Sequence, residues 1–300
     1  MNTISDTLKA KSVLISDGAW GTFLAAKGLR AGECPELWNV DRPDDVLDVA
    51  RSYVEAGADM IMTNSFGGSR FKLEHFGLAA RAAELNEAAA AISRRAAGPD
   101  RHVLASIGPT GKILMTGEVS EKALYEAFGE QAAALEKGGA DACVVETMAA
   151  IDEACLAIRA ARDRTDLDVL CTFTFNALPD GSYRTMMGVS PSETVSAALD
   201  AGAAIVGTNC GQGPAGMVGI VREMRAAAGP DVPIIVQPNA GLPKLEDGKN
   251  VFPETPEGMA KYVPDLIDAG ANILGGCCGT GPDHIRAIAA AARNATGLSL

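Results

Sequence analysis

Three cysteines in glycine-rich segments are the residues of this 300-residue chain best suited to chemistry. Cys277 and Cys278 are adjacent within residues 275–280, and Cys210 lies in the similar segment 208–211. Successive strand residues point to opposite faces, so the adjacent pair cannot easily form a disulfide, whereas glycine permits a turn that brings both thiols to one metal ion. Three thiolates without an evident fourth protein ligand indicate a catalytic zinc site with an open position.

Three of the other four cysteines lie in a different setting. Cys143, Cys155 and Cys171 belong to apolar stretches, where a thiol most often packs as a small hydrophobic group. The total of seven cysteines is odd, and residues 1–11 are polar and lack the apolar core of a secretory signal. These features predict a cytoplasmic location, where clustered cysteines more often bind metal or do chemistry than form disulfides.

The charge of the chain limits its partners. The net charge is −12, and the lysines and arginines are scattered, which argues against nucleic acid and against an anionic membrane surface. The apolar runs are short and interrupted by glycine or charge, so no membrane-spanning helix is predicted. Hydrophobic residues make up 47% of the chain, enough to bury a large core.

A motif of small residues recurs four times, centred on Gly57, Gly139, Gly202 and Gly270. Each copy follows a helical pattern and precedes an apolar run, so its glycine is expected to end a helix and turn the chain into the next strand. The glycines are 82, 63 and 68 residues apart. Each interval has room for two strand-plus-helix units, which indicates eight units in all.

Eight short apolar segments, rich in β-branched residues, are typical of strands buried on both faces. They are residues 13–16, 60–63, 103–107, 142–145, 169–174, 205–208, 234–237 and 273–275. Alanine-rich amphipathic stretches such as 81–95, 121–137 and 283–293 lie between them and predict helices. This alternation predicts a parallel sheet, and eight repeats favour a closed (β/α)8 TIM barrel that residues 1–300 form as one domain.

The predicted barrel brings the polar residues to one rim, at the ends of the strands where such barrels carry their chemistry. Asp17 follows the first strand and Glu146 the fourth, and two carboxylates beside a thiolate site suit recognition of an ammonium group. Each could instead cap a helix or lie at the surface. His75, His102 and His284 lie on helices or at strand starts, where we expect packing or surface roles.

The same barrel brings the three cysteines into reach of one ion. Cys210 follows the sixth strand and the Cys277–Cys278 pair the eighth, so the strand ends lie roughly 10 Å apart at an interstrand spacing of ~4.8 Å. Side chains that lean inward can close this gap to zinc–sulfur distances of about 2.3 Å. The alternatives are purely structural cysteines or a redox pair, for which the C-x-x-C spacing is missing.

The motifs together resemble one family over nearly the whole chain. They are residues 17–22, 34–37, 63–67, 107–111, 145–147, 209–211, 238–241 and 275–280. This set resembles the homocysteine S-methyltransferase family, which includes betaine-dependent and S-methylmethionine-dependent enzymes and the homocysteine-binding module of cobalamin-dependent methionine synthase. The resemblance implies a zinc-bearing (β/α)8 barrel with its active site at the C-terminal ends of the strands, acting in methionine biosynthesis.

The resemblance also assigns the metal site. It implies that Cys210, Cys277 and Cys278 hold one Zn²⁺ per chain and that Asn209 and Asn239 orient the metal-binding loops. A free thiol has a pKa near ~8.5, so zinc would serve to bind the homocysteine sulfur as a thiolate. The thiolate would then displace the methyl group of a donor in line, which requires orientation and no general base.

Five further positions match the part of the family pattern that holds homocysteine. Asp17 and Glu146 match positions that bind its amino group. Backbone amides near Gly18, Ala19 and Thr63 match positions that receive its carboxylate. Homocysteine and a methyl donor are therefore the expected substrates.

The methyl donor is left open by the sequence. Animal betaine enzymes cage the trimethylammonium group with aromatic side chains, but the matching positions here hold Gly67 and Thr147. Trp20 and Trp38 are candidates for another cage around betaine or a small sulfonium donor such as S-methylmethionine. The alternatives are a methyl-corrinoid protein partner that delivers the methyl group, and a zinc-binding barrel without turnover. The oligomeric state is not predicted.

Overall fold

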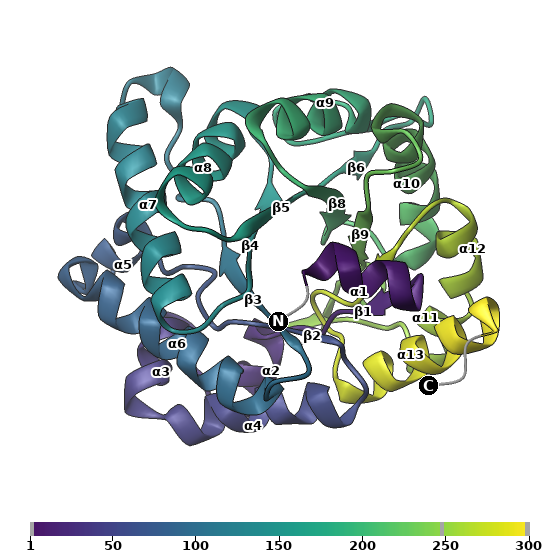
Figure 1. Ribbon diagram of the computed structural model, residues 1–300, viewed down its shortest axis with the longest axis horizontal. Helices are drawn as coiled ribbons and strands as arrows, with labels where there is room; N and C mark the ends of the chain where they lie inside the picture. Colours follow the sequence, from purple (N-terminus) through teal and green to yellow (C-terminus); the bar gives the residue numbers. More distant parts are fainter. Residues whose placement is uncertain (1–2, 247–248, 298–300) are drawn as a thin grey trace.

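The eight predicted strands form one parallel sheet that curves into a barrel (Figure 1). The structure is a computed structural model and describes residues 3–246 and 249–297. The strands are β1 (Leu14–Ile15), β2 (Met60–Met62), β3 (His102–Ile107), β4 (Ala142–Met148), β5 (Asp168–Phe173), β8 (Ile205–Asn209), β9 (Ile234–Gln237) and β12 (Ile273–Leu274). Their order is β1-β12-β9-β8-β5-β4-β3-β2, and a parallel bridge between Ser16 and Met60 links the two outer strands. The predicted (β/α)8 barrel is confirmed.

Helices surround the sheet on its outer side (Figure 1). The longer ones are α4 (Pro43–Glu55), α6 (Ala82–Ala97), α7 (Glu121–Lys137), α8 (Ile151–Arg164), α9 (Pro191–Ala201), α10 (Pro214–Ala228) and α13 (Pro282–Thr296). The shorter ones are α2 (Gly21–Ala26), α3 (Trp38–Asp41), α5 (Arg70–Glu74), α11 (Pro256–Ala260) and α12 (Val263–Asp268), with 3-10 turns at Pro35–Leu37, Ala79–Arg81 and Leu114–Thr116. The predicted helices at 81–95, 121–137 and 283–293 therefore correspond to α6, α7 and α13.

Two small hairpins interrupt the regular alternation. After β5 the chain forms β6 (Asn176–Ala177) and β7 (Tyr183–Arg184), and after β9 it forms β10 (Lys244–Glu246) and β11 (Lys249–Val251). Both lie in connections that leave the carboxyl ends of barrel strands, so they belong to the face where such barrels carry their active sites.

The sheet separates two apolar layers. The larger core packs between the strands and the helices, and Tyr53, Phe128 and Phe173 are among its largest buried side chains. The smaller core fills the barrel interior with residues such as Leu104 and Ile235. Both faces of each strand are therefore apolar, which explains the uninterrupted hydrophobic runs in the sequence.

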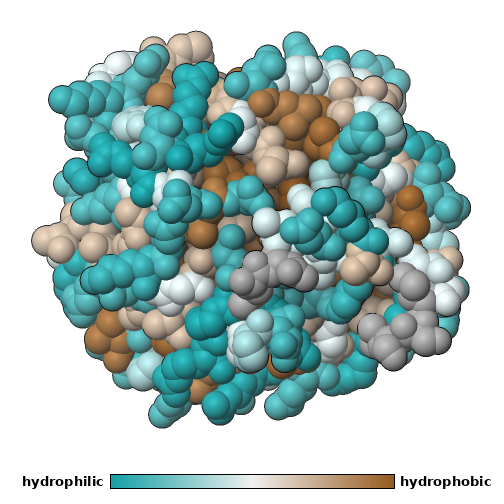
Figure 2. Space-filling model, viewed as in Figure 1, coloured by the Kyte–Doolittle hydropathy of each residue, from teal (hydrophilic) through white to brown (hydrophobic). Residues whose placement is uncertain are grey.

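The helix α1 (Ile4–Lys11) packs across the amino-terminal end of the barrel (Figure 1). Ile4 is buried against the interior core, and Thr7 Oγ1 lies 2.9 Å from Nε2 of His102 at the start of β3. Figure 2 shows this side of the molecule as mostly hydrophilic, with small apolar patches. The cavity described below opens at the opposite, carboxyl-terminal end of the strands.

The four motif glycines adopt the backbone conformation that the sequence predicts. Gly57, Gly139, Gly202 and Gly270 have φ values of 97°, 102°, 103° and 112°, which L side chains rarely adopt. Each glycine also faces an arginine from a neighbouring helix. The pairs are Gly57 with Arg293, Gly139 with Arg94, Gly202 with Arg162 and Gly270 with Arg225. Each of the four copies of the glycine motif therefore has an arginine side chain packed against its turn.

The histidines have the packing or surface positions predicted for them, and His75 is exposed. His102 is buried, and desolvation lowers its pKa. His284 accepts a hydrogen bond at Nδ1 from the Gly281 N–H, and its Nε2 lies 3.1 Å from the Glu254 carbonyl oxygen. In the described part of the chain, no helix is long and apolar enough to cross a membrane.

Candidate active site

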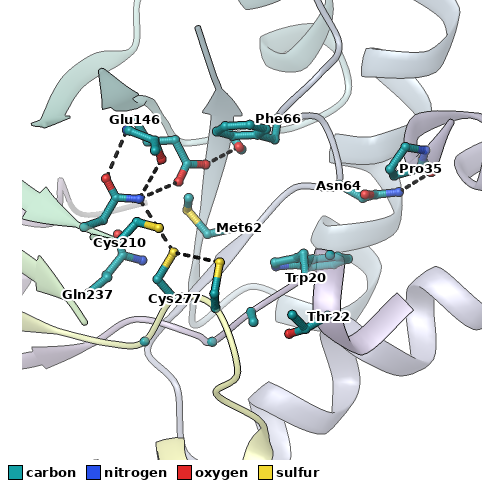
Figure 3. A pocket seen from close by; sticks show the side chains of 18 of the residues that line it. Trp20, Thr22, Pro35, Met62, Asn64, Phe66, Glu146, Cys210, Gln237 and Cys277 are labelled. Atoms are coloured by element: carbon teal, nitrogen blue, oxygen red, sulfur yellow. Dashed lines mark hydrogen bonds between the residues drawn. The ribbon is translucent and has the colours of Figure 1, made fainter. Parts of the chain in front are cut away.

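A cavity of about 420 Å³ lies at the carboxyl ends of the barrel strands. The three clustered cysteines and Glu146 line it, and the fully buried Asp17 directly precedes the lining residue Gly18. Figure 3 shows Cys210, Cys277 and Glu146 on one side of this cavity, with Trp20 and Phe66 further from Cys210. The structure thus brings together side chains that are separated by up to 261 residues in the sequence.

The sulfur atoms of Cys210, Cys277 and Cys278 lie within 4.8 Å of one another. Cys210 directly follows β8 and has φ of 59°, a conformation that few residues other than glycine adopt. Its N–H donates to the Gln237 carbonyl at 3.1 Å, and the Cys277 N–H donates to the Pro238 carbonyl at 2.8 Å. The end of β9 and the loop after it therefore fix the backbone positions of both cysteine segments relative to each other.

Hydrogen bonds between the three thiols shift their pKa values in opposite directions. Hydrogen bonds from Cys277 and Cys278 lower the pKa of the Cys210 thiol well below its ordinary value. The same contacts with Cys210, together with burial, raise the pKa of Cys277. The three thiols are therefore close enough to interact as one group.

Asp17 lies fully buried at the end of β1. Its carboxylate accepts hydrogen bonds from Trp20 Nε1 at 2.9 Å, the Met62 N–H at 2.8 Å and Ser16 Oγ at 3.3 Å. Burial raises the pKa of Asp17 to about 7, against the effect of these donors. The nearest following helix, α2, has no side-chain cap, so the capping alternative is wrong for Asp17.

Glu146 projects from an irregular part of β4. The register of β4 against β5 shifts between Val145 and Met148, and Thr147 has φ of 59°. Such irregularities re-aim side chains near active sites. The Ser106 hydroxyl donates to Glu146 Oε1, and burial raises the pKa of Glu146 to about 7, with smaller contributions from Asp17 and Cys210. The helix α8 has no side-chain cap, so the capping alternative is wrong here too.

The three positions expected to present backbone amides also line the cavity: Gly18, Ala19 and Thr63. The Ala19 N–H already donates to Thr280 Oγ1 at 3.1 Å, and the Thr63 N–H to the Leu104 carbonyl at 3.0 Å. Two of the three amides therefore have partners within the protein.

The two tryptophans have different positions. Trp20 lines the cavity. Trp38 is 6% exposed, and the Arg42 guanidinium stacks on its ring at 3.8 Å from the centroid. Trp38 lines a separate cavity of about 620 Å³ between α3 and the segment that precedes it. The prediction of Trp38 as a cage residue is therefore not supported by its position, because it does not line the cavity that holds the cysteines.

Sequence reasoning missed several cavity residues. Phe66 lines the cavity and is 42% exposed, and its ring packs where a side chain at Gly108 would lie. Ser106 is a polar residue near the end of an apolar strand, and this position was the signal available for it. Glu36 also lines the cavity, and its Oε1 accepts the Gly67 N–H at 2.7 Å. Among the described residues, no lysine, arginine or histidine lines this cavity.

Two asparagines approach the cysteine cluster from different sides. The Asn209 side chain is hydrogen-bonded within the protein and lies 3.9 Å from Cys277 Sγ. A hydrogen bond from Asn239 makes a minor contribution to the lowered pKa of Cys210. Asn239 Oδ1 and Gln237 Oε1 are buried and have no hydrogen-bond partner among the described residues. Such orphaned acceptors are expected where a ligand or ion completes a site.

The thiol cluster fits a metal ion. Three sulfur donors within 4.8 Å of one another form a soft ligand set, which suits zinc. The cluster borders an open cavity, so a fourth position could face a substrate, as in catalytic zinc sites.

These features define a (β/α)8 barrel with a thiol-rich site at the carboxyl ends of its strands. The Homocysteine S-methyltransferase family matches this chain over residues 14–292. The chain belongs to the homocysteine S-methyltransferase family.

Individual relatives agree with this assignment. The chain is 34% identical to the methionine synthase of Mycobacterium tuberculosis over 95% of this chain and 25% of that protein. It is 33% identical to the methionine synthase of Mycobacterium leprae, over 94% and 24%. The chain thus spans about a quarter of the length of these relatives. Its fold is similar to the metallated homocysteine methyltransferase MmuM from Escherichia coli, with a TM-score of 0.79, 24% identity and coverage of 96% and 99%.

Proposed function

We propose that this chain transfers a methyl group to the sulfur of homocysteine and forms methionine. The observation that carries the proposal is one cavity lined by three clustered thiols and the buried Glu146, with the buried Asp17 directly before the lining residue Gly18. Family membership supports the same reaction. The sulfur lone pair would form the new carbon–sulfur bond while the bond from the methyl group to the donor breaks and its electrons stay with the donor.

Cys210, Cys277 and Cys278 would hold one zinc ion. When bound, the metal would supply the positive charge that keeps the substrate thiol deprotonated and nucleophilic at neutral pH. MmuM, a protein of similar fold, has been solved in a metallated form, which is consistent with this proposal. Asn209 and Asn239 would hold the metal-binding loops in place.

Asp17 and Glu146 would bind the amino group of homocysteine. Both carboxylates are buried, and burial raises the pKa of each to about 7. An ammonium group would supply the opposite charge that each buried carboxylate lacks in the described structure. The Gly18 amide is our candidate for the substrate carboxylate, because the Ala19 and Thr63 amides already have partners.

The donor is best described as a small onium compound. The cavity has two aromatic side chains, Trp20 and Phe66, which can face a cation, and no basic side chain lines it in the part of the chain that the structure describes. Betaine and S-methylmethionine are the donors to test first. Their carboxylates would find no basic partner among the lining residues, so the onium group would carry most of the recognition.

A methyl-corrinoid protein is the second candidate donor. One observation favours it: the two relatives named methionine synthase are about four times as long as their match to this chain. A carrier of the methyl group would then approach the open end of the cavity as a separate protein. A zinc-binding barrel without turnover is the third reading, and the open cavity beside the thiols disfavours it.

A donor panel separates these candidates. Zinc-loaded, reduced protein is incubated with homocysteine and either betaine, S-methylmethionine or methylcobalamin, and methionine is measured. Turnover with an onium donor that falls in the Trp20→Ala or Phe66→Ala protein supports the first candidate. Turnover with methylcobalamin alone supports the second. Zinc retention without methionine from any donor would reject the proposed function.

A further inference from the structure

One side-chain amide connects the two halves of the site. Asn209, the last residue of β8, is 1% exposed. Its Nδ2 lies 3.4 Å from Glu146 Oε2 and 3.9 Å from Cys277 Sγ. The Thr147 hydroxyl is a third acceptor, at 2.7 Å from the same nitrogen. One amide nitrogen therefore approaches a carboxylate of the substrate pocket and a sulfur of the thiol cluster.

The orientation of this amide is determined by its oxygen. Asn209 Oδ1 lies 2.8 Å from the Thr172 hydroxyl and 3.0 Å from the Thr147 N–H. The Thr147 N–H is a donor in every protonation state, so only the amide oxygen can face it. The amide nitrogen must then point toward Thr147 Oγ1, Glu146 and Cys277.

The amide nitrogen has fewer hydrogens than acceptors. It carries two hydrogens, whereas three acceptors surround it. The Thr147 hydroxyl is the nearest acceptor and takes one hydrogen. Glu146 and Cys277 are left to share the other. A carboxylate and a metal-ligating thiolate are both anionic, and anionic acceptors form the stronger hydrogen bonds.

We propose that Asn209 couples metal binding at the thiol cluster to ammonium binding at Glu146. A metal held by Cys277 would keep this sulfur as a thiolate, without its proton, and the shared N–H would then turn toward it. Glu146 then loses this donor, and its Oε2 becomes available to an ammonium group. Linkage requires the reverse effect as well: an ammonium group at Glu146 tightens metal binding by the same factor.

The inference rests on the proposed function, because it takes Glu146 as the ammonium site and Cys277 as a metal ligand. Asn209 acts in it as a positioning residue. Orientation of the metal-binding loops alone would alter metal affinity in Asn209 variants. It would not make two affinities depend on each other, so the coupling factor is the decisive readout.

The test measures binding of norleucine, an amino acid of similar size to homocysteine that has no sulfur to ligate the metal. Its dissociation constant is measured by calorimetry for reduced protein with and without zinc. The zinc dissociation constant is measured against a competing chelator with and without saturating norleucine. We expect each ligand to tighten the other by about 5- to 20-fold in the unaltered protein.

The variants assign this coupling to the shared N–H. The coupling factor is the fold by which zinc and norleucine tighten each other's binding. Asn209→Ala and Glu146→Gln should each reduce the logarithm of this factor by at least half. The double variant should reduce it no further, because both changes remove the same connection. Asn209→Ser is the second variant if Asn209→Ala folds poorly. Asn86→Ala is the matched control, since Asn86 is fully buried and donates to the Gly68 and Ala82 carbonyls away from the cysteines.

The outcomes distinguish the two proposals. Zinc and norleucine that bind independently to the unaltered protein would overturn the coupling and leave the proposed function standing. Coupling that persists in both single variants, or reductions that add fully in the double variant, would also overturn it. Failure of zinc to bind would reject both proposals, whereas failure of norleucine to bind the zinc-loaded protein would reject the coupling alone.

Discussion

Cys210 is held in a backbone conformation that costs free energy. Its φ of 59° lies in the left-handed region, and such residues cost of order 1–3 kcal/mol each unless the surrounding structure compensates. The conformation turns the thiol toward Cys277 and Cys278 at the end of β8. Strain of this kind is concentrated at functional sites, which agrees with the proposed metal-binding role of this residue.

The first prediction concerns zinc content. Cys210→Ala should lower bound zinc to well below one ion per chain and abolish methionine formation, because two sulfurs and a water bind zinc less well than three sulfurs. The measurement is metal analysis of purified, reduced protein. Cys155→Ala is the control, since Cys155 packs in α8 away from the cluster. Full zinc content and activity in the Cys210→Ala protein would show that the site is wrongly assigned.

The second prediction concerns substrate affinity. Asp17→Asn should raise the KM for homocysteine by on the order of 30- to 1,000-fold, which corresponds to about 2–4 kcal/mol for a buried charge pair that loses one partner. Trp20, Met62 and Ser16 donate to this carboxylate and hold it in place. Steady-state kinetics with zinc-loaded protein tests the change. An unchanged KM would assign Asp17 to a structural role.

The third prediction concerns pH. Burial raises the pKa of Glu146 from 4.5 to about 7, so between these values the native protein keeps a proton that the unfolded chain loses. The free energy of unfolding then falls as pH rises through this range, by about 3 kcal/mol from this group. Glu146→Gln should remove that loss, so the stability of the variant relative to the unaltered protein should increase as pH rises from 4 to 8.

Urea denaturation of metal-free, ligand-free protein at pH 4 and pH 8 measures this difference. The gain should disappear near pH 4, where the carboxyl is protonated in both states. An equal effect of Glu146→Gln at both pH values would contradict the raised pKa. Loss of methionine formation in a more stable variant would show that the buried charge is kept for function at a cost in stability.

Part of the site could be predicted from residue types, and part could not. The cysteines, Asp17 and Glu146 stand out because thiols and carboxylates directly after buried strands have no packing reason to be there. Phe66 and Trp38 show the limit of this reasoning. Both are aromatic residues near the rim in sequence, and only the path of each loop decides that Phe66 lines the cavity and Trp38 stacks on Arg42.

At the scale of the elements, the strands were predictable because each is apolar on both faces. All eight predicted strands are present, and their ends differ from the prediction by at most three residues. The largest difference is at β4, which continues past Val145 to Met148 through an irregular register. That extension includes Glu146, a polar residue that an apolar pattern excludes from a strand.

The glycine motif was predicted as a helix-ending turn, but its arginine partners were not. Arg225 donates to the Gly270 carbonyl at 2.7 Å and to Asn272 Oδ1 at 2.8 Å. Arg94 makes the equivalent contacts with the Gly139 carbonyl and Asp141. Each arginine is 45 residues before its glycine in these two pairs, so the sequence pattern of either residue alone does not reveal the contact.

The fourth prediction tests this contact. A Cβ added at Gly270 would lie 2.6 Å from Arg225 Nε, and the φ of 112° is unfavourable for any L side chain. Gly270→Ala should therefore destabilise the protein by more than about 1 kcal/mol. Gly297→Ala is the matched control, because Gly297 has φ of 67° and no atom lies near its added Cβ. Equal losses in urea denaturation would show that the Arg225 contact adds nothing to the backbone cost.

At the scale of the whole molecule, the metal-binding loops and the core are separate. The sheet and its helices bury two apolar layers that do not include Cys210, Cys277 or Cys278. Those cysteines lie in connections after β8 and β12 at one end of the barrel. A chain of this size can bury enough surface to fold without a metal. The stability of the barrel and the proposed chemistry of its rim should therefore be separable in experiment.

The last prediction is that zinc is needed for turnover and not for folding. Removal of zinc by a chelator should stop methionine formation while the far-ultraviolet circular dichroism and a cooperative thermal transition are retained. The free energy of unfolding should fall only by the amount that loss of a bound ligand explains, about 4 kcal/mol if free zinc had been a thousandfold above its dissociation constant. Restored zinc should restore activity in reduced protein. Loss of the helical signal on chelation would mean instead that the thiol cluster stabilises the barrel itself, as structural zinc sites do in small domains.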